Sequence, residues 1–200
     1  MGAGDGSRQR MLETAREHFL ARSYRRATLR EIARDAQVTT GSLYHHFSGK
    51  DELFVEVCME GMRNLLRRLH GTAELTAGRP IDERSIALFD AYVSFYIEER
   101  GYFELITRLQ THREQLNIDA ELADRVEDAS QKIVDEMVEM LRQAAPGLSE
   151  TETKQRVLLA VGMGEGLVSC DRRGLLGRFG LTLGSFRGTI LRMFQELVRE

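Results

Sequence analysis

Hydrophobic residues recur along this chain three or four positions apart, which is the spacing of α-helices. Charged residues stand between them, and no segment alternates with the period of two that a half-buried β-strand shows. The chain holds only two prolines in 200 residues, which also favours helices. The pattern predicts an all-α protein of about nine helices, over residues 8–24, 29–36, 40–46, 51–69, 82–99, 102–113, 119–145, 150–170 and 181–198.

The second and third predicted helices are short, and each follows a residue that can cap it. Thr28 and Glu31 have the spacing of a capping box, in which each side chain pairs with a free backbone N–H. Thr39 or Thr40 can cap the third helix in the same way. Two short helices joined by a tight turn are the device that places a helix in the major groove of DNA.

The third predicted helix has one apolar and one polar face. Leu43 and Phe47 fall on the same side and are expected to hold the motif together with Leu29 and Ile32. The opposite side carries hydroxyls, rings and bare backbone but no carboxylate, which suits phosphates and base edges. We predict that DNA is contacted by Thr39, Thr40, Gly41, Ser42, Tyr44 and His45.

Charge supports a polyanionic partner at the N-terminal end. Residues 1–50 carry a formal charge of +4, whereas the whole chain carries −3. Thr28 at a helix N-terminus and Lys50 at the start of the next helix are predicted to bind DNA phosphates. A plainer alternative stays open for single residues, since Thr28 and Thr39 can be caps only and His45 can be an ordinary surface residue.

The run TLREIARDAQVTTGSLYHHFSGKDELF, residues 28–54, resembles the DNA-binding signature of TetR/AcrR-type transcriptional regulators. The close resemblance covers about residues 8–69, and the later region is similar only in length and helical character. The resemblance implies a homodimer on a palindromic operator and a C-terminal pocket whose ligand releases the DNA. It also implies core positions at Leu43 and Phe47 and DNA contacts at Thr28, Thr40, Ser42, Tyr44, His45 and Lys50.

We expect two domains. Residues 1–50 form the helix-turn-helix domain, together with the start of a connecting helix over residues 51–69, and residues 51–200 form a helical domain for ligand binding and dimerisation. Residues 71–80 are predicted to be a linker. Cys58 and Cys170 form no metal or redox motif and are interpreted as reduced packing residues.

The predicted C-terminal domain offers candidates for a ligand pocket and a dimer interface. Aromatic and methionine side chains suit an apolar or aromatic guest, and an arginine can orient it, although for any one aromatic or methionine a place in the core is the plainer alternative. These pocket candidates are Phe89, Tyr92, Tyr96, Phe103, Arg108, Met137 and Met163. Glycines four positions apart suggest that helices approach closely, within the subunit or across a dimer. The predicted dimer interface involves Gly180, Gly184, Gly188 and Leu191.

The sequence favours a cytoplasmic, one-component transcriptional regulator, most simply a repressor, whose partners are operator DNA, a second copy and an unknown small effector. No metal-ligand spacing, nucleophile elbow or cofactor motif is present, so neither an enzyme nor a cofactor is expected. No stretch has the roughly 20 apolar residues of a membrane span. The alternative is a helical protein-interaction adaptor without regulated DNA binding.

Overall fold

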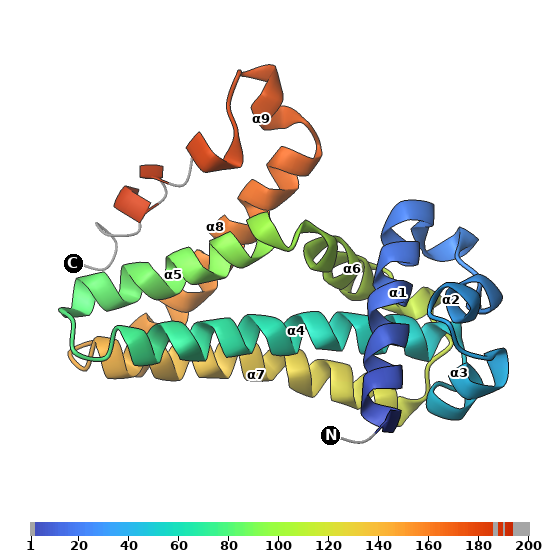
Figure 1. The fold of residues 1–200 in the computed structure, drawn as a ribbon. Coiled ribbons are helices and arrows are strands. Elements are labelled where there is room, and N and C mark those ends of the chain that lie inside the picture. The colour runs from blue at the N-terminus through green and yellow to red at the C-terminus, as the bar shows by residue number, and fades with distance from the viewer. Residues whose placement is uncertain (1–2, 186–187, 190, 194–200) are drawn as a thin grey trace. The chain divides into compact units, whose positions relative to one another are not determined.

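The computed structural model describes residues 3–185, 188–189 and 191–193, and the described residues are helical throughout apart from short connections. No strand occurs among them, which confirms the all-α prediction (Figure 1). The labelled helices are α1 (Ala3–Arg26), α2 (Leu29–Asp35), α3 (Thr40–His46), α4 (Lys50–Leu75), α5 (Ile81–Glu98), α6 (Arg100–Thr111), the 3-10 helix η1 (Arg113–Gln115), α7 (Ala120–Ala144), α8 (Glu150–Arg172) and α9 (Leu175–Arg178).

Several helix boundaries differ from the predicted ones. Helix α4 continues to Leu75, so the first half of the predicted linker is helical. The break between α5 and α6 falls at Glu99, whereas Gly101 lies inside α6. A side chain at Gly101 would collide with Leu20 of α1, so this glycine allows two helices to approach and does not end one. The predicted helix over residues 181–198 lies partly outside the described residues.

The chain divides into two compact units that do not coincide with the predicted division at residue 50. The first unit comprises Met1–Arg63 and Gly101–Ala129, and the second comprises Asn64–Arg100 and Ser130–Glu200. The first half of α4 belongs with the N-terminal helices because it is the centre of their core. Its side chains from Leu53 to Cys58 are all buried.

The core of the first unit is built around α1 and α4. Met11, Leu12 and Phe19 are buried on one side of α1, as the helical period predicts. The rings of Phe19 and Phe54 meet edge to face with centroids 5.3 Å apart, and Tyr24 meets Phe54 in the same way at 4.9 Å. Such aromatic contacts add to the free energy of burying the rings.

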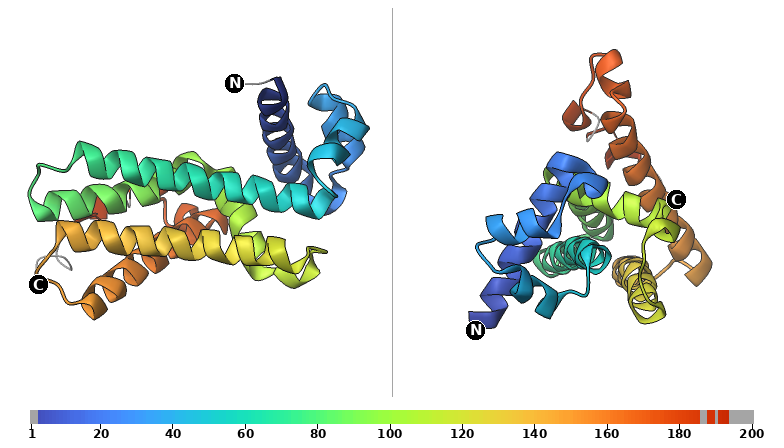
Figure 2. Two further views of the ribbon diagram at one scale, coloured as in Figure 1. Left: turned by 90° about the horizontal axis from the view of Figure 1, so that it is seen from below. Right: turned by 90° about the vertical axis from the view of Figure 1, so that its right-hand side faces the viewer.

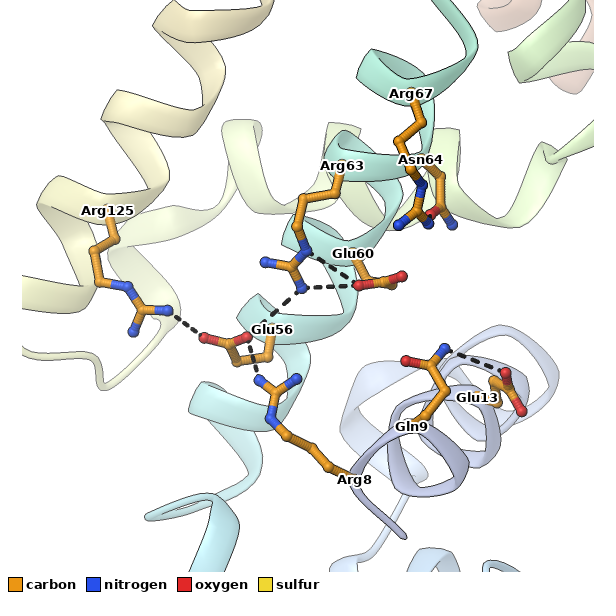
Figure 3. A network of polar contacts seen from close by, with 9 residues as sticks. All are labelled: Arg8, Gln9, Glu13, Glu56, Glu60, Arg63, Asn64, Arg67 and Arg125. Carbon is orange, nitrogen blue, oxygen red and sulfur yellow. Dashed lines mark hydrogen bonds and ion pairs between the residues drawn. The ribbon is translucent and has the colours of Figure 1, made fainter. Parts of the chain in front are cut away.

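A buried carboxylate joins three segments of the first unit (Figure 3). Glu56 of α4 is 3% exposed, and its two oxygens each lie 2.6 Å from a guanidinium nitrogen, one of Arg8 in α1 and one of Arg125 in α7. Arg63, two turns further along α4, reaches within 3.9 Å of the same carboxylate. A carboxylate removed from water requires such partners, so this cluster fixes how the three segments pack.

In the second unit the C-terminal part of α4 runs beside the C-terminal part of α7 (Figures 1 and 2). There His70 Nε2 lies 3.5 Å from a carboxylate oxygen of Glu136. Helix α8 begins with a complete capping box between Ser149 and Glu152 and packs against α5. Its buried positions follow the helical period and are Thr153, Val157, Ala160, Gly164 and Val168.

Helices α8 and α5 approach each other closely at Gly164. A Cβ there would lie 2.8 Å from Cε1 of Tyr92, whose ring is buried. Gly164→Ala is therefore expected to lower the free energy of unfolding by about 1 kcal/mol, because overpacking outweighs the gain in helix propensity. Thermal and urea unfolding of the full chain measure this change.

Gly71 of α4 provides the matched control, since nothing lies within 4 Å of its Cβ position. Gly71→Ala is expected to raise stability by about 0.5 to 1 kcal/mol through helix propensity alone. Equal changes in the free energy of unfolding for Gly164→Ala and Gly71→Ala would contradict the close approach at Gly164.

The part of the chain that the structure describes contains no helix that is long and apolar enough to cross a membrane. Within the same residues, no three His, Cys, Asp or Glu side chains gather as metal ligands would. Both cysteines are free, and burial raises the pKa of the Cys58 thiol in α4.

Candidate nucleic-acid interface

Helix α2 begins as the sequence predicts, with one difference in its cap. The hydroxyl of Thr28 accepts a hydrogen bond from the Glu31 backbone N–H at 3.3 Å. The Glu31 carboxylate accepts from the Thr28 hydroxyl at 2.7 Å and also pairs with Arg22 of α1. The hydrogen bond from Thr28 is the main cause that holds the pKa of Glu31 below its usual value, and the one from Arg22 adds to it. The cap therefore also ties α2 to α1.

The turn between α2 and α3 reverses the chain within four residues. Gln37 has a φ of 57°, in the left-handed region, and the Val38 N–H returns to the Ala33 carbonyl at 2.9 Å. Thr39 then caps α3, since its hydroxyl accepts from the Ser42 N–H at 3.0 Å. This sharp reversal is what a helix-turn-helix requires.

Helix α3 presents the two faces that its spacing predicts. Leu43 and Phe47 are buried, and Ile32 of α2 is buried with them. Tyr44 is 55% exposed although it is a large aromatic residue. The other predicted contacts on this helix are exposed or half-buried, namely Thr39, Thr40, Gly41, Ser42 and His45.

Lys50 lies at the start of α4, against the end of α1. Its ammonium donates to the backbone carbonyl oxygens of Ala27 at 3.3 Å and Arg25 at 3.5 Å. It also stands 4.6 Å from the ring centroid of Tyr24. Burial lowers its pKa. Lys50 thus has a structural role that the sequence motif does not reveal.

Comparison with known proteins agrees with this geometry. Residues 11–57, which include α2, the turn and α3, match the family described as bacterial regulatory proteins, tetR family. Over this segment, which is about a quarter of its length, the chain is similar to the tetR family of bacterial regulatory proteins. The match ends within α4, so it covers the helix-turn-helix and its supporting helices.

Curated relatives are similar to this chain over about half of its length or less. The transcriptional repressor KstR2 of Mycobacterium tuberculosis is 37% identical over 105 residues, which cover 52% of this chain and 50% of KstR2. The chain spans between 39% and 62% of the length of the first curated relatives that it matches.

Solved structures share the fold over almost the whole chain. A tetR-family regulatory protein from Rhodococcus RHA1 superposes with a TM-score of 0.71 and 16% identity, covering 99% of this chain and 98% of that one. The transcriptional regulator FadR from Bacillus subtilis, solved with stearoyl-CoA, gives a TM-score of 0.70 at 14% identity over 93% of this chain and 96% of its own. At these identities the likeness establishes the fold.

The predicted ligand residues do not form one group. Phe103 and Arg108 belong to the first unit, whereas the other five belong to the second. Phe89 and Met137 line a cavity of about 30 Å³ in the second unit, with room for about two water molecules. Met163 is half-buried on α8.

Tyr92 and Tyr96 of α5 are buried and pair with each other. Their rings meet edge to face with centroids 5.1 Å apart. Burial is the main cause that raises the pKa of Tyr92, and the neighbouring Tyr96 and Glu165 raise it further. Burial likewise raises the pKa of Glu165 on α8. Both tyrosines are therefore core residues of the second unit in this conformation.

The predicted glycine face of the dimer is not a single helical face. Gly180 has a φ of 69° and lies in a turn after α9, so it cannot continue a helix through Gly184 and Gly188. The latter two are exposed helical residues, and Leu191 is half-buried. A different apolar surface lies on α8, where Leu158 and Leu159 are 58% and 54% exposed.

Proposed function

We propose that this chain is a one-component repressor of the TetR family that binds a palindromic operator as a homodimer and is released by a small ligand. The observation that carries the proposal is the exposed face of α3. Tyr44 stands out in solvent there, among hydroxyls and bare backbone, while Leu43 and Phe47 anchor the helix beneath it. In this proposal Thr28 and Lys50 bind phosphates on either side of the reading helix.

The proposal assigns base contacts to Thr40, Gly41, Ser42, Tyr44 and His45. One seven-residue helix touches only a few base pairs, so two copies related by a two-fold axis are needed for specificity in a genome. A palindromic operator follows from that symmetry. The relative KstR2 is named a repressor, which supports repression as the outcome of binding.

For the dimer, the proposal assigns the exposed face of α8. Leu158, Gly162 and Gly166 are four positions apart and line one side of this helix, with Leu159 beside them. Gly162 and Gly166 have nothing within 4 Å of their Cβ positions, so a second backbone can approach closely. Exposed leucines beside bare backbone are typical of a helix–helix interface.

The proposed ligand of the second unit is apolar or aromatic. FadR from Bacillus subtilis was solved with stearoyl-CoA, which shows that a regulator of this fold can hold a small molecule. The cavity lined by Phe89 and Met137 is far smaller than the roughly 300 Å³ of ordinary ligand pockets, so a guest there would have to select a more open conformation.

A gel-shift experiment with the full chain and DNA from its own promoter region tests the central claim. We expect sequence-selective binding that weakens as salt is raised, because phosphate contacts release counterions. Competition with unrelated DNA is the control for selectivity. Binding that is equal for both DNAs, or no binding, would favour the adaptor alternative.

The dimer is tested by placing a charge on the exposed face of α8. Leu158→Glu is expected to convert a dimer into a monomer in analytical ultracentrifugation, because a carboxylate cannot be buried against its own copy without a partner. Leu75→Glu is the matched control, since Leu75 is 84% exposed on α4. If both variants sediment as wild type does, the dimer surface lies elsewhere.

A further inference from the structure

A basic pocket lies in the first unit where α1, α4, α6 and η1 meet. It has a volume of about 210 Å³ and is lined by Tyr24, Arg25, Phe54, Arg108, His112, Gln115 and Leu116. Its lining includes two guanidinium groups, an imidazole and a carboxamide, and no aspartate or glutamate. These residues come from distant parts of the sequence and are assembled only by the fold.

In the part of the chain that the structure describes, the two arginines of this pocket have no carboxylate partner. Among the described residues, neither Arg25 nor Arg108 forms an ion pair with a carboxylate. The Arg108 guanidinium carbon stands 5.3 Å from the ring centroid of Tyr24, and the Lys50 ammonium stands 4.6 Å from the same centroid. Two cations beside one ring repel each other, so a bound anion would lower the electrostatic energy.

One wall of the pocket is apolar. Tyr24 and Phe54 are packed edge to face with centroids 4.9 Å apart, and Leu116 lies along the same pocket. The hydroxyl of Thr111 donates to the Thr107 carbonyl at 2.8 Å, so His112 Nδ1–H donates to that hydroxyl at 2.7 Å and the ring is held at the edge of the pocket. The pocket therefore combines charge-assisted hydrogen-bond donors with an aromatic surface.

The backbone just before the pocket is strained. Ser23 has φ 63° and ψ 155°, a conformation that almost only glycine adopts. This kink inside α1 changes the direction of the chain immediately before Tyr24 and Arg25, two of the lining residues. Strain of this kind is found at ligand-binding sites more often than elsewhere.

We propose that this pocket binds a small organic carboxylate with an apolar body. Arg108 and Arg25 would receive the carboxylate, since a guanidinium donates two parallel hydrogen bonds to such a group. The apolar body would lie along Tyr24 and Leu116. The volume of about 210 Å³ suits a single-ring or short-chain acid and is about seven times that of the cavity in the second unit.

The ligand would also regulate DNA binding, a step that rests on the proposed function. The pocket is lined by the last residues of α1, and the backbone carbonyl of Arg25 holds Lys50. A carboxylate drawn toward Arg25 and Arg108 would reposition the end of α1 directly before Thr28 and α2. A ligand that prefers this arrangement shifts the population away from the DNA-binding one.

Calorimetric titration of the full chain with benzoate at low salt tests the pocket. Saturable binding of benzoate is expected, with no binding of benzyl alcohol or benzylamine and weaker binding of inorganic phosphate. Arg108→Gln is expected to weaken benzoate binding about tenfold or more, since it removes a charge-assisted hydrogen-bond donor. Arg79→Gln, an exposed arginine of the second unit, is the matched control and should bind benzoate as wild type does.

The melting temperature of each variant without ligand establishes that it is folded. Three results would overturn the proposed carboxylate site. They are the absence of saturable benzoate binding, equal affinity for benzyl alcohol, and unchanged benzoate affinity in folded Arg108→Gln. A gel shift with benzoate separates the two proposals. Operator binding that benzoate leaves unchanged overturns the regulatory step alone, whereas loss of operator binding without any ligand overturns the proposed function.

Discussion

Replacing Arg8 and Arg125 together by glutamine is expected to lower the free energy of unfolding by about 3 to 5 kcal/mol. The Glu56 side chain is almost fully buried, and both of its close guanidinium partners disappear in this variant. Arg63 remains, but at 3.9 Å it cannot replace two hydrogen-bonded partners at 2.6 Å. Urea unfolding followed by circular dichroism measures the change.

The reason for so large an effect is the carboxylate and not the arginines. A buried charge that loses its partners keeps the cost of leaving water without the attraction that offset it. Adding Glu56→Met to the double variant should therefore restore much of the lost stability, because it removes the buried charge itself.

Exposed ion pairs provide the control for this prediction. Arg142 and Lys154 pair with Glu139 and Glu150 on the solvent side of α7 and α8. The double variant Arg142→Gln and Lys154→Gln should unfold nearly as wild type does, since exposed pairs contribute little. If the Arg8 and Arg125 double variant is as stable as wild type, these two arginines do not stabilise the buried carboxylate of Glu56.

Tyr44→Ala is expected to weaken operator binding by at least about thirtyfold and to leave the melting temperature nearly unchanged. A base contact contributes about 1 to 3 kcal/mol, and the proposed dimer uses each contact twice, so the loss is at least about 2 kcal/mol per complex. The side chain is mostly exposed, so its removal leaves no cavity in the core. Fluorescence anisotropy with labelled operator DNA measures the affinity.

Two further substitutions make the Tyr44 experiment specific. Tyr44→Phe removes the hydroxyl alone and so separates its contribution to DNA affinity from that of the ring. Leu75→Ala is the control, because it removes an exposed apolar side chain far from α3 in sequence. Wild-type affinity in Tyr44→Ala would exclude this residue from the reading face. Lys50→Ala is a less clean probe, because Lys50 holds the end of α1 through Ala27 and should lose stability as well as DNA affinity.

The helix-turn-helix was predictable because its signals are local. The caps at Thr28 and Thr39 and the shared face of Leu43 and Phe47 depend on residues three or four positions apart. Those separations are set by the geometry of one helix turn, so the sequence alone determines which side of α3 is buried. The match of residues 11–57 to the tetR family lies over the same local pattern.

The pairings that stabilise or could regulate this protein were decided only by the tertiary structure. Glu56 meets Arg125 across 69 positions, and Tyr24 meets Arg108 although the two are far apart in sequence. Helical periodicity identifies a buried face but not the partner that covers it. For the same reason the sequence groups the ligand candidates only by residue type. In the fold, Phe103 and Arg108 belong to one unit, whereas Phe89 and Tyr92 belong to the other.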